Sequence, residues 1–453
     1  MTSKITALLF ALLIGFNFSN AQQDQECLNN LSIFSELVKQ KKYDEAYEPW
    51  MLVRTKCPKF HLNIYKGGEK ILKHKIKKAT GTEQAAFLKD YTKLLDDGGS
   101  YFAKKYPKSK VLSKKLDNAY KYQKVLGLSD KQVYDMYDNA YTTDKENFKS
   151  PSILLRYFKM AFKFYNQGTK TASDTQALFD KYDDVNEKVE IEVNDASKKL
   201  NQILARKEAG TPKKNDKAYE KFYRQTLEAY DKVEKGLAGE IDDIITCDIL
   251  TSLYENSFEE NKDDTVWLQR AMNRMYAKDC KDEPLFLKLV ERKNELEPNA
   301  DTAFYLYLLT GEQKYFDQTI SLETDPLKKA ALYNKLANEA KRKGQYGKAR
   351  SYYRDALKYN PSNGLPYLKI AQMYASSANN CGDTVFNKRA VYWLAASEAR
   401  KAGKVDSRLK STAAKTAASY AGRAPSTADI FQAGNKGQTI KIGCWIGASV
   451  KVP

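Results

Sequence analysis

Proline, glycine and histidine are scarce in this chain, and each scarcity excludes a class of protein. The 453 residues include 12 prolines and 22 glycines, fewer turn residues than an all-β protein of this length needs. The two histidines, His61 and His74, are not spaced as a metal-ligand pair on one helix face. Hydrophobic residues make up 42% and charged residues 29% of the sequence, which is typical of a folded, helix-rich protein.

Motifs that carry chemistry are missing as well. The sequence has no C-x-x-C pair, no GxGxxG, no phosphate-binding glycine loop and no zinc-protease motif. The acidic run from Asp180 superficially resembles a calcium loop, but its sixth residue is Val185 and its twelfth is Ile191, where such a loop needs glycine and glutamate. We therefore expect no enzymatic activity and no cofactor or metal.

The N-terminus carries a targeting signal. The segment "MTSKITALLFALLIGFNFSNAQQ" combines Lys4, an apolar run from Ile5 to Phe18, and small residues before a cleavage point after Ala21. This pattern is typical of a secretory signal peptide, which predicts removal of residues 1–21. No later segment has 18 uninterrupted apolar residues, so we expect an exported protein without a membrane span. The predicted location is the periplasm, with the periphery of the outer membrane as one option.

The formal net charge is +18. In a cytosolic protein this excess would indicate nucleic acid. Outside the cytoplasm, a basic surface more plausibly meets an anionic envelope polymer, acidic lipid headgroups or an acidic protein. The alternative is that the excess lysines form a solvated coat without a partner.

Six cysteines in an exported chain indicate disulfides. The predicted pairs are Cys27 with Cys57, Cys247 with Cys280, and Cys381 with Cys444. The first two pairs are each symmetric about a polar break, "KQKKYDE" and "NKDD", so each would join the open end of one helical hairpin. The third pair would tie the C-terminal tail to the body. Each bond would contribute roughly 3–4 kcal/mol in the chain-entropy model.

Helical periodicity is clearest in "YGKARSYYRDALKYNP", which ends at Pro361. Ala349, Tyr353 and Ala356 recur at steps of three and four residues, which predicts a helix with small residues for close approach and aromatics to fill the gaps beside them. Pro361 cannot continue the helix. Gly344 marks the turn from a preceding helix.

That preceding helix carries Tyr333, Leu336 and Ala337 on one face. Together the two helices closely resemble the tetratricopeptide repeat, a 34-residue helix–turn–helix unit. One departure is Ala340, where the family usually carries an aromatic residue. A second unit begins in phase at Gly364, so the clear resemblance covers about 329–403.

The resemblance implies a superhelix whose concave face is lined by the first helix of each repeat. The inward-pointing positions it implies in the clear repeat are Asn334, Asn338, Lys341 and Arg342. The asparagines could bond an extended peptide, and the cations an acidic side chain or a terminal carboxylate. The next repeat offers Leu368 and Gln372 rather than more cations. The alternative is that the four residues are ordinary exposed helix positions.

Other features place helix ends and breaks. Ser129–Gln132 and Ser173–Gln176 predict capping boxes. The segment Thr175–Lys207 predicts one long helix or two, and Ala209–Asp216 is the best internal linker. Helix-ending prolines are predicted at Pro58, Pro107, Pro298 and Pro361.

The C-terminal tail differs from the rest of the chain. Ile440, Ile442, Cys444 and Ile446 alternate in a way that predicts a strand. An isolated strand is unstable alone, so we expect the tail to pack on the last repeat as a cap.

The predicted fold is all-α: an irregular TPR-like helical-repeat superhelix (α-solenoid) with a short β-like C-terminal tail. The predicted parts are a signal peptide (1–21), an N-terminal helical-repeat region (22–208), central helical hairpins (217–298), a C-terminal TPR region (299–425) and a capping tail (426–453). The predicted function is a non-enzymatic periplasmic scaffold for protein partners in an envelope complex, in outer-membrane assembly or secretion. The alternative is a protein that binds peptidoglycan or an anionic polysaccharide. No nucleic-acid partner is expected.

Overall fold

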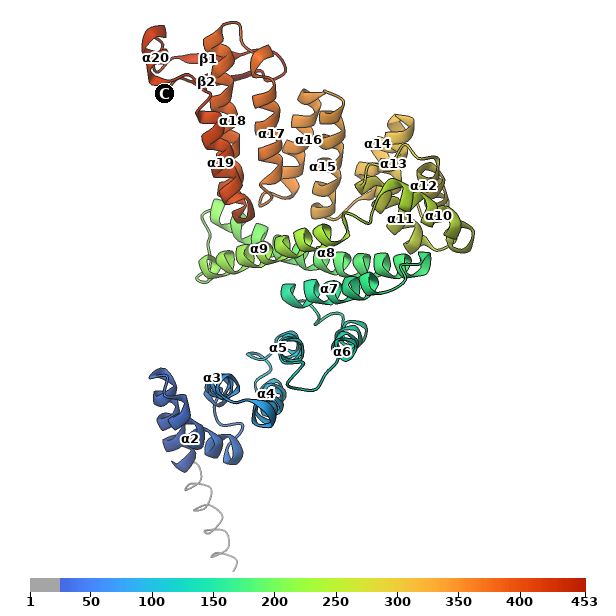
Figure 1. Cartoon of the computed structure of the whole chain (residues 1–453). Helices are drawn as coiled ribbons and strands as arrows, with labels where there is room; N and C mark the ends of the chain where they lie inside the picture. The colour runs from blue at the N-terminus through green and yellow to red at the C-terminus, as the bar shows by residue number, and fades with distance from the viewer. Residues whose placement is uncertain (1–24) are drawn as a thin grey trace, which may run out of the picture. The chain divides into compact units, whose positions relative to one another are not determined.

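The computed structural model describes residues 25–453, and the predicted signal peptide lies outside them. The chain divides into two compact units, unit 1 up to Phe164 and unit 2 from Tyr165 to Pro453. Helices build both units, and the one sheet within the described residues has two strands (Figure 1). The all-α prediction is therefore confirmed. None of the described helices is long and apolar enough to cross a membrane.

Unit 1 is a succession of short helices. It begins with a helix over 25–39. The helices that follow are α2 (Tyr43–Lys56), α3 (Asn63–Lys78), α4 (Gly81–Tyr101), α5 (Lys108–Lys121), α6 (Asp130–Thr143) and α7 (Pro151–Gln167), the last of which runs three residues past the boundary. The capping box at Ser129 is present: the Ser129 hydroxyl accepts from the Gln132 backbone, and the Gln132 side chain accepts from the Ser129 backbone. The Cα atoms of Cys27 and Cys57 lie 6.4 Å apart in a disulfide that joins the first helix to the end of α2.

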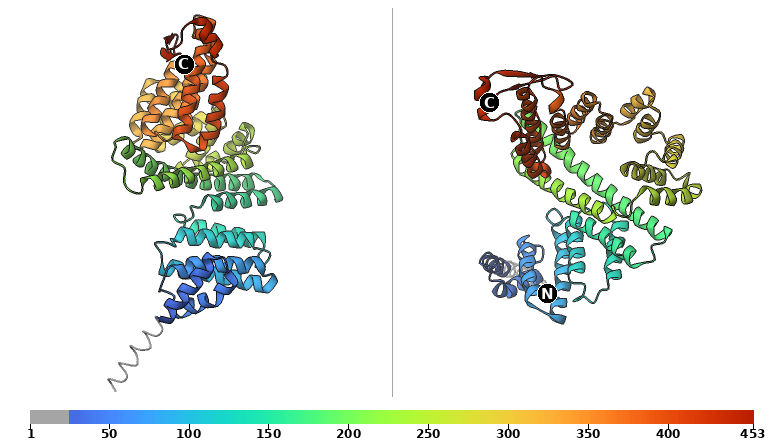
Figure 2. Two further views of the ribbon diagram at one scale, coloured as in Figure 1. Left: turned by 90° about the vertical axis from the view of Figure 1, so that its left-hand side faces the viewer. Right: turned by 45° about the horizontal axis from the view of Figure 1, so that its top comes forward.

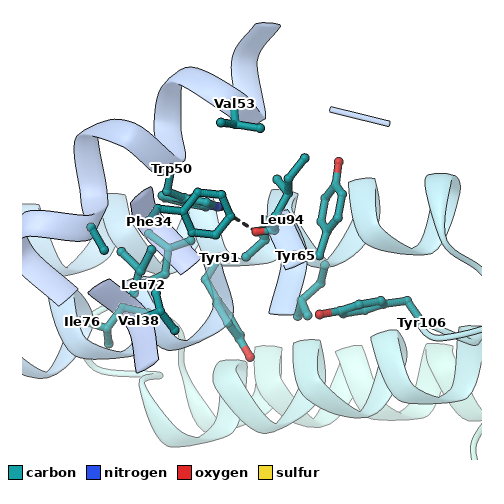
Figure 3. Packing of buried hydrophobic residues seen from close by; sticks show 14 of the residues in the cluster. Phe34, Val38, Trp50, Val53, Tyr65, Leu72, Ile76, Tyr91, Leu94 and Tyr106 are labelled. Atoms are coloured by element: carbon teal, nitrogen blue, oxygen red, sulfur yellow. Dashed lines mark hydrogen bonds between the residues drawn. The ribbon is translucent and has the colours of Figure 1, made fainter. Parts of the chain in front are cut away.

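Buried aromatic and aliphatic side chains form a core cluster in the first part of unit 1 (Figure 3). Two of its large rings pack against glycines. Trp50 of α2 is fully buried, and its indole N–H donates to the Ile64 carbonyl at 2.7 Å. The ring lies over Gly68 of α3, where a Cβ atom would come within 2.6 Å of it. Gly67 makes the same room for Phe34, with a Cβ separation of 2.9 Å. Two adjacent glycines thus let α3 approach both preceding helices closely.

Glu69 fixes α3 to the next two helices. Its carboxylate accepts hydrogen bonds from Tyr91 of α4 at 3.0 Å and from Tyr106 at 2.6 Å, and it forms an ion pair with Lys114 of α5. Burial opposes ionisation, but the bonds from Lys114, Tyr106 and Tyr91 outweigh it and lower the pKa of Glu69. A buried carboxylate with this many donors is stable as a charge.

Unit 2 begins with one long antiparallel hairpin of α8 (Ala172–Glu208) and α9 (Asp216–Ile241). The predicted long helix is therefore a single helix. The capping box predicted at Ser173–Gln176 is wrong, because Thr171 caps the helix and exchanges hydrogen bonds with Asp174. The predicted linker, 209–216, is the tight loop of this hairpin and not a domain boundary. Arg206 holds the loop closed through Asp216 at 2.7 Å, a bond that lowers the pKa of Asp216 to about 2.

The rest of unit 2 is a series of helices ending in the tail. They are α10 (Cys247–Asn261), α11 (Thr265–Ala277), α12 (Pro284–Leu296), α13 (Ala300–Thr310), α14 (Gln313–Leu322), α15 (Pro326–Arg342), α16 (Tyr346–Tyr359), α17 (Leu365–Ser376), α18 (Val385–Val405), α19 (Lys410–Ala421) and α20 (Thr427–Ala433). The predicted repeat is the pair α15 and α16, and Gly344 between them has a φ of 72°, which favours glycine. The Cα atoms of Cys247 and Cys280 lie 5.5 Å apart in a disulfide across the α10–α11 hairpin.

The helix-ending role predicted for the prolines holds at three positions. Pro58, Pro298 and Pro361 each stand two residues beyond a helix end. Pro107 is the exception, because α4 ends at Tyr101 and Pro107 precedes the first residue of α5. Proline fits the start of a helix, where its missing N–H is not needed.

The tail is a hairpin and not the single strand that the alternation predicts. Strand β1 (Thr439–Ile442) pairs antiparallel with β2 (Ala448–Lys451). Cys444 lies in the turn with a φ of 50°, so the alternation beyond Ile442 does not reflect extended backbone. The tail does pack on the last repeat: Ile446 is fully buried, and Trp445 donates to the Ser377 hydroxyl at 2.9 Å. The Cα atoms of Cys381 and Cys444 lie 5.2 Å apart, so all three cysteine pairs bond as the spacing predicts.

Gly68→Ala should destabilise unit 1 strongly, because the new methyl group meets the Trp50 ring at 2.6 Å and forces overpacking that costs about 1–3 kcal/mol or more. Gly239→Ala in α9 is the control. A Cβ there meets nothing within 4 Å, so the same change should stabilise the helix by about 0.5–1 kcal/mol. Urea unfolding of both variants measures the difference, and equal effects would contradict this account of the core.

Ile446→Ala should lower the free energy of unfolding of unit 2 by about 2–4 kcal/mol, because it opens a cavity between the tail and the last repeat. Ser449→Ala, an exposed change in the same hairpin, should stay within about 0.5 kcal/mol. Dye binding to exposed apolar surface should rise only for Ile446→Ala. Unfolding at an unchanged urea concentration would show that the tail is not a cap.

Candidate binding site

The four residues predicted for the groove lie along α15, and the structure divides them into two pairs. Asn338 and Arg342 are exposed, whereas Asn334 and Lys341 are half-buried. Lys341 donates to the Gln372 side chain of α17 at 2.8 Å. The Asn334 side-chain oxygen is buried and has no hydrogen-bond partner within residues 25–453.

Two of these residues have intramolecular partners that matter for stability. Asn338 accepts a hydrogen bond of 2.6 Å from the hydroxyl of Tyr353, a buried residue of α16. Arg342 forms an ion pair with Glu339 one turn earlier, at 2.7 Å. Asn338 therefore helps to hold the two helices of the repeat together, which its predicted role in binding did not include.

A cation that the sequence comparison missed lies beside them. Lys369 stands on α17, the first helix of the next repeat, and burial together with the charge of Lys369 lowers the pKa of Lys341. We call Lys341 and Lys369 the cationic patch, and Arg342, which pairs with Glu339, lies outside it. The signal was available in the sequence, because Lys369 directly follows Leu368, the position that the repeat register selected. An error of one residue in the repeat register rotates the selected position by about 100° around the helix axis, so the register selected Leu368 and missed Lys369.

A large hollow lies on another side of α15. A cleft of about 610 Å³ is lined by residues from α8, α11, α12, α13 and α15. From α15 it takes Lys328, Ala331, Leu332 and Lys335, and none of the four predicted residues lines it. The cleft and the cationic patch are therefore separate surfaces of the same helix.

Lys335 lines this cleft, and intramolecular contacts hold its side chain in place. Its ammonium pairs with Asp301 at 2.6 Å and lies 5.3–5.8 Å from the ring centres of Tyr276, Phe304 and Tyr305. Burial opposes the charge, but Tyr305 and Asp301 outweigh it and raise the pKa of Lys335. This lysine joins α13 to α15 and is not available to a ligand anion.

The long hairpin of α8 and α9 gives the repeat helices a common support. Figures 1 and 2 show it lying across the ends of α15 to α19. Lys198 of α8 pairs with Asp325 before α15 at 2.6 Å, and Arg224 of α9 donates to the Val405 carbonyl at the end of α18 at 2.5 Å. The hairpin therefore contacts both the start of α15 and the end of α18, which belong to two successive repeats.

A buried ion pair joins the same hairpin to α11. Arg274 pairs with Asp183 of α8, and its guanidinium lies 4.6 Å from the Phe179 ring centre and 5.7 Å from that of Tyr254. Arg270, one turn earlier, bonds Glu187 at 2.8 Å. Burial raises the pKa of Asp183 to about 6, against the lowering effect of Arg274.

Both histidines contact other residues of unit 1. His74 lies 3.1 Å from Asp44, which also pairs with Lys75 and Lys78, and the side chain of His61 accepts from the Asn63 backbone. Within residues 25–453, no group of three or more His, Cys, Asp or Glu side chains is arranged to hold a metal ion. The most distinctive arrangement in unit 2 is therefore the cationic patch on two successive first helices.

Comparisons with known proteins add little to this. No family model and no curated protein sequence matches the chain. A human IFIT1 dimer with m7Gppp-AAAA shares 10% identity over 87% of this chain and 90% of that chain, with a TM-score of 0.25. Yeast Tom70 shares 13% identity over 91% and 84%, with a TM-score of 0.24. The Naa15/Naa10 complex bound to HypK-THB shares 13% identity over 90% of this chain and 70% of that chain, with a TM-score of 0.18.

Arg274→Met should lower the free energy of unfolding by about 3–5 kcal/mol at pH 7, because it leaves the buried Asp183 carboxylate with only the more distant Arg270, at 3.8 Å, as an ionic partner. The loss should shrink near pH 4.5. Asp183 holds a proton there, since its pKa in the folded protein lies above its ordinary value, and no unpaired charge remains. Urea unfolding at both pH values measures this.

Lys199→Met is the control. Lys199 pairs with Asp195 on α8, the helix that also carries Asp183, and both side chains of this pair are about half exposed. It should cost about 0.5 kcal/mol or less at either pH. A loss for Arg274→Met that is equally large at pH 4.5 would show that the arginine acts through packing alone.

Proposed function

We propose that this chain is a non-enzymatic scaffold of the periplasm that uses its helical repeats to hold a protein partner in an envelope complex, in outer-membrane assembly or secretion. The observation that carries the proposal is the cationic patch, which spans the first helices of two successive repeats. Repeat helices stacked in this way present a continuous surface for an extended partner.

The chemistry of the patch favours a carboxylate. Lys341 and Lys369 are close enough for their charges to repel, which contributes to the lowered pKa of Lys341. A carboxylate between them would relieve that repulsion and form charge-assisted hydrogen bonds. The exposed Asn338 and Arg342 stand beside it and could bond the adjoining backbone. An acidic side chain or a C-terminal carboxylate of a partner protein fits this arrangement.

The proposed compartment rests on the sequence and on the cysteines. The N-terminal pattern is that of a signal peptide. All six cysteines pair in the structure, each pair joining segments 30 or more residues apart, and such bonds persist in oxidising compartments. Both observations support export.

Lys341→Ala combined with Lys369→Ala should weaken association with the partner about tenfold or more, since each charge-assisted hydrogen bond contributes roughly 1.5–3 kcal/mol. Crosslinking in intact cells, followed by affinity purification and mass spectrometry, measures which proteins are lost. Asn338→Ala is a poor test, because it would also leave the buried Tyr353 hydroxyl without its acceptor.

The control for this experiment is Lys404→Ala with Lys415→Ala, which removes the same charge from exposed positions on α18 and α19. It should capture the same proteins as the unchanged chain. Equal recovery of every partner by the Lys341 and Lys369 variant would remove the patch from the account.

A further inference from the structure

Charge in unit 1 alternates from one helix to the next. The formal net charges are −1 for α2, +5 for α3, −2 for α4, +4 for α5, −2 for α6 and +3 for α7. Residues 25–164 hold 28 lysines and arginines against 16 aspartates and glutamates, a net +12 of the chain's +18. One third of the chain therefore carries two thirds of its net charge, concentrated on every second helix.

The basic helices are neighbours in space. Glu69 of α3 pairs with Lys114 of α5, and Asp117 of α5 pairs with Arg156 of α7. Two of the acidic helices are joined in the same way, through Arg54 of α2 and Asp90 of α4 at 2.8 Å. Ion pairs thus connect the three basic helices, which form a basic layer, and two of the three acidic helices.

On α3 the cations form a row. Lys66, Lys70, Lys73 and Lys77 recur at steps of four, three and four residues, and all four are exposed. This face lies opposite the one that carries the buried side chains of the helix. Within the described residues, no carboxylate comes within ion-pair distance of Lys66, Lys70 or Lys77.

The neighbouring helix continues the row. Lys110 and Lys121 of α5 occupy the corresponding face on either side of Lys114, which meets Glu69 of α3. This ion pair brings α5 beside α3, so the lysines of α5 add to the charge of the row on α3. We call the six lysines the basic face: Lys66, Lys70, Lys73, Lys77, Lys110 and Lys121.

The N-terminal ends of the basic helices add to the positive electrostatic potential of the basic face. The helices α3, α5 and α7 have no acidic residue in the first turn, whereas α2, α4 and α6 each have at least one. The N-terminal end of a helix is its positive end, so Lys66 and Lys110 add charge where the dipole is already unfavourable. Like charges one turn apart on α3 also repel. Lys73 and Lys110 have partial compensation, since Lys73 lies 3.8 Å from Glu69 and Lys110 lies 4.0 Å from the Tyr106 ring centre. Lys66, Lys70 and Lys77 have no ion pair within the described residues, so an external anion would relieve their repulsion.

We propose that the basic face binds a linear anionic polysaccharide. The row on α3 offers charge at every helical turn and, on the outward face of that helix, no aromatic or aliphatic anchor. The neighbouring α5 exposes one aromatic residue, Tyr120. Protein partners depend on such anchors, and single-stranded nucleic acid needs aromatic platforms for its bases. A hydrophilic polymer with one negative group per sugar needs neither. This binding goes beyond the scaffold function, because it uses unit 1 and the cationic patch lies in unit 2.

The test is titration of the mature full-length chain with polygalacturonate fragments at several salt concentrations, with neutral dextran as the blank. Changing Lys66, Lys70, Lys73 and Lys77 together to Gln should weaken binding at least about tenfold at low salt and make the salt dependence shallower, as expected when fewer ionic contacts form. The melting temperature should stay the same or rise, because repulsion along α3 is relieved.

The matched control changes Lys42, Lys89, Lys93 and Lys131 to Gln, which removes the same charge from exposed positions outside the basic layer. It should bind within about twofold of the unchanged chain. An equal loss in both variants would mean that only net charge matters and would overturn the proposal. Failure of the unchanged chain to bind polygalacturonate, or tighter binding of an aspartate-rich peptide of the same charge and length, would also overturn it.

A further experiment distinguishes polysaccharide binding by the basic face from protein binding by the cationic patch. The Lys341 and Lys369 variant should bind polygalacturonate as the unchanged chain does. If it loses that binding, the polymer site belongs to the cationic patch and the assignment to the basic face is wrong.

Discussion

A helical hairpin cannot bury its own apolar side, and the whole structure follows from how successive hairpins cover one another. Each needs its neighbour to come close, which requires small residues opposite large ones. Gly68 beneath Trp50 in unit 1 and the buried Ala349 and Ala356 beside Tyr353 in unit 2 are two solutions to this requirement. Once the apolar sides are used for stacking, the outward faces of the helices are free to carry charge.

Local patterns were readable from the sequence, and long-range ones were not. The α15–α16 repeat follows from residue spacing within 40 residues, and the capping box at Ser129 depends on two residues three apart. Two of the cysteine pairs were predictable because a hairpin is symmetric about its loop, and Cys381 with Cys444 was the pair that remained. By contrast, Cys444 looked like part of a strand, because alternation alone does not show where a hairpin turns.

The surroundings of the candidate site residues were not predictable from the sequence, for a physical reason. The repeat resemblance placed four candidate residues on α15, but the neighbouring helices decide which side of that helix is open. Lys335 looks like a free cation in the sequence, yet Asp301 and three aromatic rings enclose it. Lys369 was missed because the repeat register selected Leu368, the residue directly before it. The basic layer of unit 1 needed helix boundaries before it could be seen at all.

The account depends most on the hairpins being joined at their open ends in an exported chain. Peptide mapping of the purified, non-reduced protein tests this most directly. The account predicts three linked pairs and no free thiol: Cys27 with Cys57, Cys247 with Cys280, and Cys381 with Cys444. Free thiols, or a linkage between cysteines of different pairs, would contradict both the arrangement of the hairpins and the proposed compartment.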